Sequence, residues 1–166
     1  MDGGDKATLA VAYLMPGAGT LMAVGAYKLY PEGIRYFANC EKPSWAVKSS
    51  RVYAAMDMGA VLPIGCAAML VHKYGGGCSN KMVAYGLGAY TASVTLSGLV
   101  VPAFLGKQLA ATAAICGAAA ASGILTVALF AKVSKEAGLM MVPWSLLHFY
   151  YTALLAGTKP PGKATS

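Results

Sequence analysis

The sequence is short of charge: only 11% of its 166 residues are Asp, Glu, Lys or Arg. Soluble domains carry about 25% charged residues, so this composition excludes a soluble globular domain. Hydrophobic residues make up 57% of the chain, and most charges stand at the borders of long uncharged runs. The sequence therefore predicts an integral membrane protein.

Acidic residues are the scarcest charged group, with 6 Asp and Glu against 13 Lys and Arg. The basic residues form no dense patch, so the net charge of +7 does not indicate a nucleic-acid-binding protein. Lysine and arginine beside apolar runs contact lipid headgroups instead. The residues in such positions are Lys28, Arg51, Lys73, Lys81, Lys107, Lys132 and Lys159.

The 4 cysteines and 2 histidines form no metal-binding or disulfide pattern, because neither a C-x-x-C pair nor a histidine at metal-ligand spacing is present. Cys66 and Cys116 lie inside apolar runs, where cysteine is a small apolar filler. We also find no Ser/His/Asp arrangement and no phosphate-binding loop. The sequence predicts no catalytic residues and no metal site.

Long runs with few or no charges predict five membrane helices. A hydrocarbon core of about 30 Å needs about 20 residues at about 1.5 Å per residue. The runs at 82–106 and 108–131 are separated by one charge, Lys107, and predict a hairpin against which the others pack. The predicted fold is all-α, an integral membrane bundle of five transmembrane helices in one domain. The predicted spans are about 7–29, 50–73, 82–106, 108–132 and 137–158.

The longest polar connection is the first loop, at about 30–49, which contains Pro43 and Trp45. A connection of about 20 residues is uncommon in a compact bundle and often serves as a lid or binding loop. An interfacial segment with Tyr36 and Trp45 at the lipid headgroups explains the composition equally well. The sequence leaves both interpretations open.

Charge asymmetry favours a cytosolic C terminus. With five spans, 8 basic residues lie on the side of the first loop, third loop and tail, and 5 lie on the other side. The tail, 159–166, is rich in Pro, Gly and Lys, which predicts disorder. The 8 are Lys28, Arg35, Lys42, Lys48, Arg51, Lys107, Lys159 and Lys163; the 5 are Lys6, Lys73, Lys81, Lys132 and Lys135.

Asp57 is the acidic residue inside a predicted span, about 10 Å along the helix from Ser50. An ionisable group at that depth costs roughly a few kcal/mol unless it is paired or hydrated, so Asp57 is a functional candidate. Tyr53, one turn earlier, is a candidate hydrogen-bond donor. The alternative is an acid that reaches the first-loop interface, toward Lys48 or Arg51.

His148 lies within the fifth predicted helix, near Tyr150 and Tyr151. An acid–base pair with Asp57 is one interpretation, although nothing in the sequence places the two together. A histidine that is hydrogen-bonded inside the bundle is the alternative.

Several motifs occur in the order and spacing of one membrane protein family. Lys42–Trp45 resembles the end of that family's first loop, Gly88–Thr91 its third-helix G-x-Y-T, and Pro102–Gly106 its P-x-F-F-G. Two further segments, 117–121 and 142–144, are similar to its fourth and fifth helices. The family is that of the translocator proteins, also called tryptophan-rich sensory proteins or peripheral benzodiazepine receptors.

The resemblance covers about 33–155 and implies a five-helix bundle with a pocket under the first loop. Family members bind porphyrins, including haem, as well as cholesterol and synthetic benzodiazepine ligands. For this chain the resemblance implies a receptor or transporter for an apolar ligand such as porphyrin, haem or cholesterol. Haem would be a ligand of the protein, and no resident cofactor is expected. The resemblance also implies a homodimer through the small residues Gly88 and Ala92, located in the outer mitochondrial membrane if the source is eukaryotic.

By the same resemblance, Pro43 and Trp45 belong to the lid, and Pro102 and Phe104 shape the third helix beside the pocket. The complete set of predicted ligand-binding residues is Pro43, Trp45, Tyr53, Asp57, Ser97, Pro102, Phe104, Leu147, Tyr151 and Leu154.

The sequence also departs from the family pattern. The third-helix L-N-x-x-W reads Leu96–Val100, without the Asn or the Trp, and the only tryptophans are Trp45 and Trp144. This disfavours the tryptophan-dependent porphyrin breakdown of bacterial members, so we expect no enzymatic activity. No base follows Tyr151 until Lys159, which disfavours the C-terminal cholesterol pattern. The lost pocket residues favour an alternative function, that of a non-binding structural subunit of a larger membrane complex.

Overall fold

The structure is a computed structural model that describes residues 14, 16, 17, 25 and 28–161. Within these residues the fold is all-helical, as predicted, and four helices are long and apolar enough to cross a membrane. The predicted span at 7–29 lies largely outside the described residues, so the five-span bundle stays a prediction. The helices are α2 (Pro31–Ala38), α3 (Ser50–Tyr74), α4 (Lys81–Leu105), α5 (Leu109–Val133) and α6 (Lys135–Gly157).

Side-chain caps and glycines set the ends of the helices. The Asn80 side chain accepts a hydrogen bond from the Met82 N–H at 3.0 Å and so caps the start of α4, and Ser134 caps α6 in the same way. Between α3 and α4, Gly76 and Gly77 adopt φ values of +79° and +81°. Glycine tolerates these values without steric cost, so the chain reverses in a few residues.

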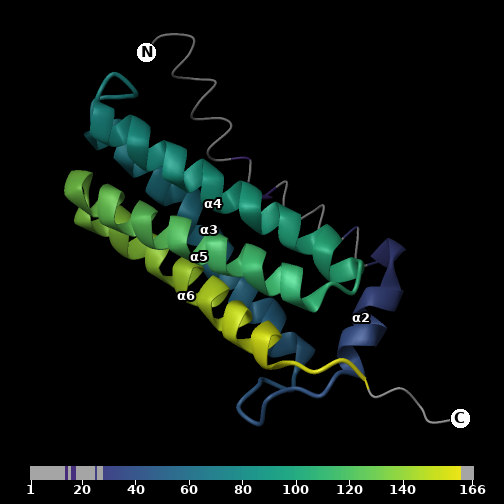
Figure 1. Ribbon diagram of the computed structural model, residues 1–166. Coiled ribbons are helices and arrows are strands. Elements are labelled where there is room, and N and C mark those ends of the chain that lie inside the picture. Colours follow the sequence, from purple (N-terminus) through teal and green to yellow (C-terminus); the bar gives the residue numbers. More distant parts are fainter. Residues whose placement is uncertain (1–13, 15, 18–24, 26–27, 162–166) are drawn as a thin grey trace, which may run out of the picture.

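The four long helices pack in the order α4, α5, α6, α3 (Figure 1). The α5–α6 pair makes the most extensive contact, followed by α4–α5 and then α3–α6. The predicted hairpin of 82–106 and 108–131 is therefore present as α4 and α5. Although α3 and α4 are consecutive in the chain, they touch at few positions, and α6 rather than α4 is the main neighbour of α3.

Large side chains with no exposed surface form the centre of the bundle. The rings of Tyr90 and Phe130 stack with centroids 6.1 Å apart and join α4 to α5. Gly86 allows this contact, because a Cβ there would lie 3.1 Å from the Phe130 ring. Ile64 and Met141 complete the centre from α3 and α6. In lipid, such close packing is a main source of helix association.

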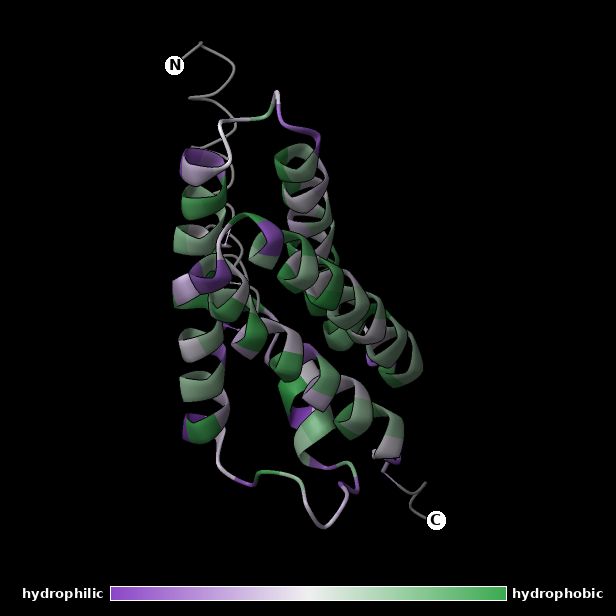
Figure 2. Cartoon of the chain, turned by 90° about the vertical axis from the view of Figure 1, so that its left-hand side faces the viewer, coloured by the Kyte–Doolittle hydropathy of each residue, from purple (hydrophilic) through white to green (hydrophobic). Residues whose placement is uncertain are grey.

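Hydrophobic residues run along the whole length of the long helices (Figure 2), and many large ones are exposed. Leu62, Leu139 and Phe149 expose 71%, 69% and 65% of their surface, on α3 and α6. Helices that are hydrophobic all round are typical of membrane spans. The chain is therefore an integral membrane protein.

The first loop differs from its prediction, because it contains the eight-residue helix α2, which begins at Pro31. This helix lies across the end of the bundle where α4 ends (Figure 1). A Cβ on Gly33 would lie 2.9 Å from the Leu105 Cα, and the Phe37 and Phe104 rings meet at 5.2 Å. A helix this short is marginal alone, so these contacts to α4 stabilise it.

Candidate functional site

The second half of the first loop, 39–49, is attached to the C-terminal end of α6. Glu41 and Lys159 exchange two backbone hydrogen bonds, of 3.1 and 2.9 Å. Pro43 packs so closely on the last turn of α6 that a Cβ on Gly157 would lie 2.8 Å from its Cγ. The loop therefore covers the end of the bundle where α3 begins and α6 ends.

Three tyrosines gather beneath this part of the loop and meet a tryptophan of the loop itself. We call Trp45, Tyr53, Tyr150 and Tyr151 the aromatic cluster. The Trp45 ring meets Tyr150 edge-on at 5.7 Å, and Tyr53 stacks on Tyr151 at 6.2 Å. The Val47 N–H donates a hydrogen bond of 3.1 Å to the Tyr150 hydroxyl. Tyr150 thus contacts the loop through both its ring and its hydroxyl group.

Asp57 joins the cluster from α3. Its Oδ1 accepts a hydrogen bond of 2.7 Å from the Tyr151 hydroxyl on α6. The hydroxyl of Tyr53, the predicted donor, lies instead 3.4 Å from the Tyr150 hydroxyl. A hydroxyl donor offsets part of the cost of a carboxylate inside a membrane helix, and here it also links α3 to α6.

A buried series of hydrogen bonds links three helices in the interior of the bundle. The Trp144 Nε1–H donates to the Ser93 Oγ at 3.0 Å, and the Ser93 hydroxyl donates to the Ala119 carbonyl at 2.9 Å. Ser93 has no exposed surface and Trp144 exposes only 4%. One serine hydroxyl therefore joins α4, α5 and α6.

His148 continues this polar network toward the aromatic cluster. Its Nδ1 lies 3.0 Å from the Trp144 carbonyl, which can only accept, so Nδ1 carries the proton. In the neutral ring Nε2 is then the acceptor for the Ser97 hydroxyl, also at 3.0 Å. These contacts match the interpretation of a histidine hydrogen-bonded inside the bundle.

The predicted site residues separate into two groups. The structure brings Pro43, Trp45, Tyr53, Asp57 and Tyr151 together where the first loop meets α3 and α6. This is the candidate site.

The other predicted residues are not members of the aromatic cluster, although Leu147 and Phe104 belong to apolar clusters against which Tyr151 also packs. Ser97 bonds to His148, while Leu147 and Leu154 are buried in the packing of the bundle. Phe104 packs with Phe37 in a second apolar cluster at the α2 end of the bundle. Pro102 is exposed on α4.

Sequence reasoning missed Tyr150, which holds the loop, and Lys48, which lines a pocket. The signal for Tyr150 was its place beside Tyr151 in a run of aromatics on the fifth predicted helix. The pairing with the Val47 amide, 103 positions away, has no local signature.

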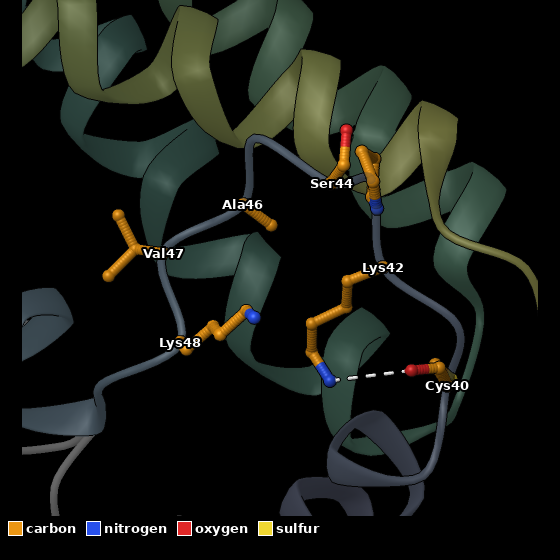
Figure 3. A pocket seen from close by; sticks show the side chains of 7 residues that line it. Cys40, Lys42, Ser44, Ala46, Val47 and Lys48 are labelled. Atoms are coloured by element: carbon orange, nitrogen blue, oxygen red, sulfur yellow. Dashed lines mark hydrogen bonds between the residues drawn. The ribbon is translucent and has the colours of Figure 1, made fainter.

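An open pocket of about 380 Å³ lies within the loop itself (Figure 3). Cys40 is buried at its edge, and this burial raises the pKa of the Cys40 thiol, partly offset by the positive charge of Lys42. The Cys40 thiol therefore stays protonated at neutral pH. The lining residues are Cys40, Lys42, Pro43, Ser44, Ala46, Val47 and Lys48.

Metal binding has no support in the described part of the chain, where no three His, Cys, Asp or Glu side chains are grouped as ligands. The four cysteines are free thiols.

The fold and the site define a helical membrane protein with an aromatic site beneath a loop at one end of its bundle. The model of the TspO/MBR family matches residues 9–159, so the chain belongs to the TspO/MBR family, as the motifs predicted. A comparison with curated protein sequences returned no match.

Proposed function

We propose that this chain is a membrane receptor or transporter that binds an apolar small molecule, a porphyrin, haem or a sterol, beneath the first loop. The observation that carries the proposal is the aromatic cluster, which is held under the loop by the Val47–Tyr150 hydrogen bond. Aromatic rings with few polar groups are the usual lining of small-molecule sites. Flat aromatic faces also suit a planar or polycyclic ligand.

In this proposal the chain is a single five-helix domain, with 7–29 supplying the fifth span. The C terminus is cytosolic, and the location is the outer mitochondrial membrane in a eukaryotic source. The protein binds its ligand and performs no chemistry on it.

The proposal includes a homodimer through Gly88 and Ala92. Both are exposed on α4, and no atom lies within 4 Å of the position that a Cβ on Gly88 would take. Small residues on an open helix face support close helix association. If the ligand tests fail, this face favours the alternative of a structural subunit, for which Gly88→Leu is expected to abolish association.

Saturable binding tests the proposal directly. The full chain in lipid nanodiscs is titrated separately with protoporphyrin and with cholesterol, and bound ligand is measured. We expect at least one of them to saturate. No saturable binding of either ligand would refute the proposed function.

The role of the loop is tested by Tyr150→Phe, which removes the hydroxyl that accepts from Val47. One neutral hydrogen bond contributes about 1 kcal/mol, so we expect amide exchange at Val47 to rise about fivefold and ligand affinity to fall. Tyr85→Phe, on an exposed part of α4, is the matched control. Unchanged exchange at Val47 would show that the tyrosine hydroxyl does not hold the loop.

A further inference from the structure

The pocket within the first loop has a charge pattern that the aromatic cluster lacks. Lys42 and Lys48 both line it, and its lining contains no acidic residue. In Figure 3 the two lysine side chains extend into the same space. The rest of the lining is apolar or weakly polar, with Pro43, Ala46 and Val47 among it. The pocket therefore combines positive charge with an apolar wall.

The two lysines differ in what already surrounds them. The Lys42 ammonium donates to the carbonyl groups of Phe37, Ala38 and Cys40, at 2.7, 3.2 and 3.5 Å. The Phe37 and Ala38 carbonyls belong to the last turn of α2, where the helix dipole is negative and favours a cation. The same ammonium lies 4.6 Å from the centre of the Phe37 ring. Lys42 is therefore fixed in place and engaged by the protein.

Lys48 is exposed, and no hydrogen bond or ion pair in the described part of the chain engages its ammonium. A lysine near a membrane often extends outward to lipid headgroups. Lys48 instead points into the pocket from a loop that is attached to α6 (Figure 3). It is thus the cation of this pocket that is available to pair with an incoming anion.

The pocket and the aromatic cluster share one segment of chain. Trp45, a cluster residue, stands between the pocket residues Ser44 and Ala46. Val47 also lines the pocket, and its amide N–H donates to the Tyr150 hydroxyl. A ligand with an apolar body and an anionic group can therefore engage both regions at once.

We propose that the loop pocket receives the anionic group, a carboxylate or a phosphate, of an amphiphile whose apolar body lies at the aromatic cluster, and that Lys48 pairs with that group. The inference rests on the proposed function and narrows its ligand class to an anionic amphiphile such as a tetrapyrrole dicarboxylate. A neutral sterol gains nothing from this pocket.

The test compares protoporphyrin with its dimethyl ester, which keeps the ring and lacks the negative charges. Both are titrated into the full chain in nanodiscs of zwitterionic lipid, for the natural sequence, Lys48→Gln and Arg51→Gln. Arg51 is exposed and close in the chain but does not line the pocket, so it controls for the general loss of one positive charge.

We expect the natural sequence to prefer the diacid over the ester. Lys48→Gln should weaken diacid binding about three- to tenfold, the range for a solvent-exposed charge pair with a good hydrogen bond, and leave ester binding unchanged. Arg51→Gln should change the ratio of diacid affinity to ester affinity less than about twofold. The preference should also fall as salt is raised.

A second set of nanodiscs, with part of the lipid replaced by phosphatidylserine, identifies the source of the anion. If the pocket holds a lipid headgroup, the anionic lipid weakens diacid binding to the natural sequence and not to Lys48→Gln. If it holds a free amphiphile, the anionic lipid has no such selective effect.

Equal affinity for diacid and ester, or an equal effect of Lys48→Gln on both, would overturn the inference while the proposed function stands. Saturation by neither porphyrin nor cholesterol would overturn the proposed function and this inference with it.

Discussion

The buried hydroxyl of Ser93 gives a prediction whose magnitude follows from its contacts. It accepts from the Trp144 Nε1–H at 3.0 Å and donates to the Ala119 carbonyl at 2.9 Å, with no exposed surface. Ser93→Ala leaves the indole N–H without this partner, whereas the helix ladder of α5 still uses the carbonyl. In soluble proteins a stranded buried donor costs about 1–3 kcal/mol.

The membrane lowers this value. Interhelical hydrogen bonds in lipid average about 0.6 kcal/mol and reach about 1.7 kcal/mol, because the unfolded chain also finds partners there. We therefore expect Ser93→Ala to lower the free energy of unfolding by about 1 kcal/mol. Trp144→Phe removes the donor from the other side, so the two changes form a double-mutant cycle.

The assay is unfolding by sodium dodecyl sulfate in mixed micelles, followed by far-ultraviolet circular dichroism. Fluorescence is unsuitable because Trp144→Phe removes one of only 2 tryptophans. The expected coupling energy between Ser93 and Trp144 is about 0.5–1.5 kcal/mol. Additive effects, with coupling below about 0.3 kcal/mol, would refute the view that this bond joins α4 to α6.

Two further predictions follow from close packing and from burial. Gly138→Ala would place a Cβ 2.7 Å from the Ala131 Cβ and 2.9 Å from its Cα, so it should destabilise the α5–α6 pair by about 1–3 kcal/mol. Gly98→Ala, at an exposed position of α4 with no atom within 4 Å of the added Cβ, is the control and should be neutral or stabilise the protein by up to about 1 kcal/mol through helix propensity. Equal unfolding curves for the two variants would contradict the close approach at Gly138. Maleimide should label the exposed Cys78 at least about tenfold faster than Cys40 near neutral pH, because Cys40 is buried and its raised pKa leaves little thiolate. Labelling of Cys40 should become faster as the pH rises toward that raised pKa. Mass spectrometry of the labelled peptides measures both rates, and labelling of Cys40 as fast as that of Cys78 near neutral pH would contradict this prediction.

The long helices were predictable because charge is excluded from the hydrocarbon core. Lys81 and Lys107 bound the third run, and the helix found there is α4, Lys81–Leu105. Lipid and the protein interior are both apolar, however, so hydrophobic residues occur on every face of these helices. The sequence pattern therefore does not indicate which face of a helix packs against its neighbours. The sequence therefore contained the lengths of these helices but not the packing of α6 against α3.

Contacts between residues far apart in the sequence explain the other differences between the predicted and the observed structure. The prediction placed Tyr53 beside Asp57 because one helical turn separates them, whereas the donor is Tyr151, 94 positions away. The helix α2 escaped prediction because it is short and lies in a polar connection, and its contacts come from α4. Both features depend on tertiary contacts that no local pattern encodes.

Trp45 is placed to report a ligand that binds beneath the first loop. Trp45 is 53% exposed beside Tyr150, whereas Trp144 is 4% exposed inside the bundle. The most direct measurement is a fluorescence titration of the full chain in nanodiscs with protoporphyrin, alongside Trp45→Phe and Trp144→Phe. We expect saturable quenching that Trp144→Phe retains and Trp45→Phe largely loses. Saturable quenching that Trp45→Phe retains in full would place the ligand away from the first loop, and quenching that never saturates would show that no specific porphyrin site exists.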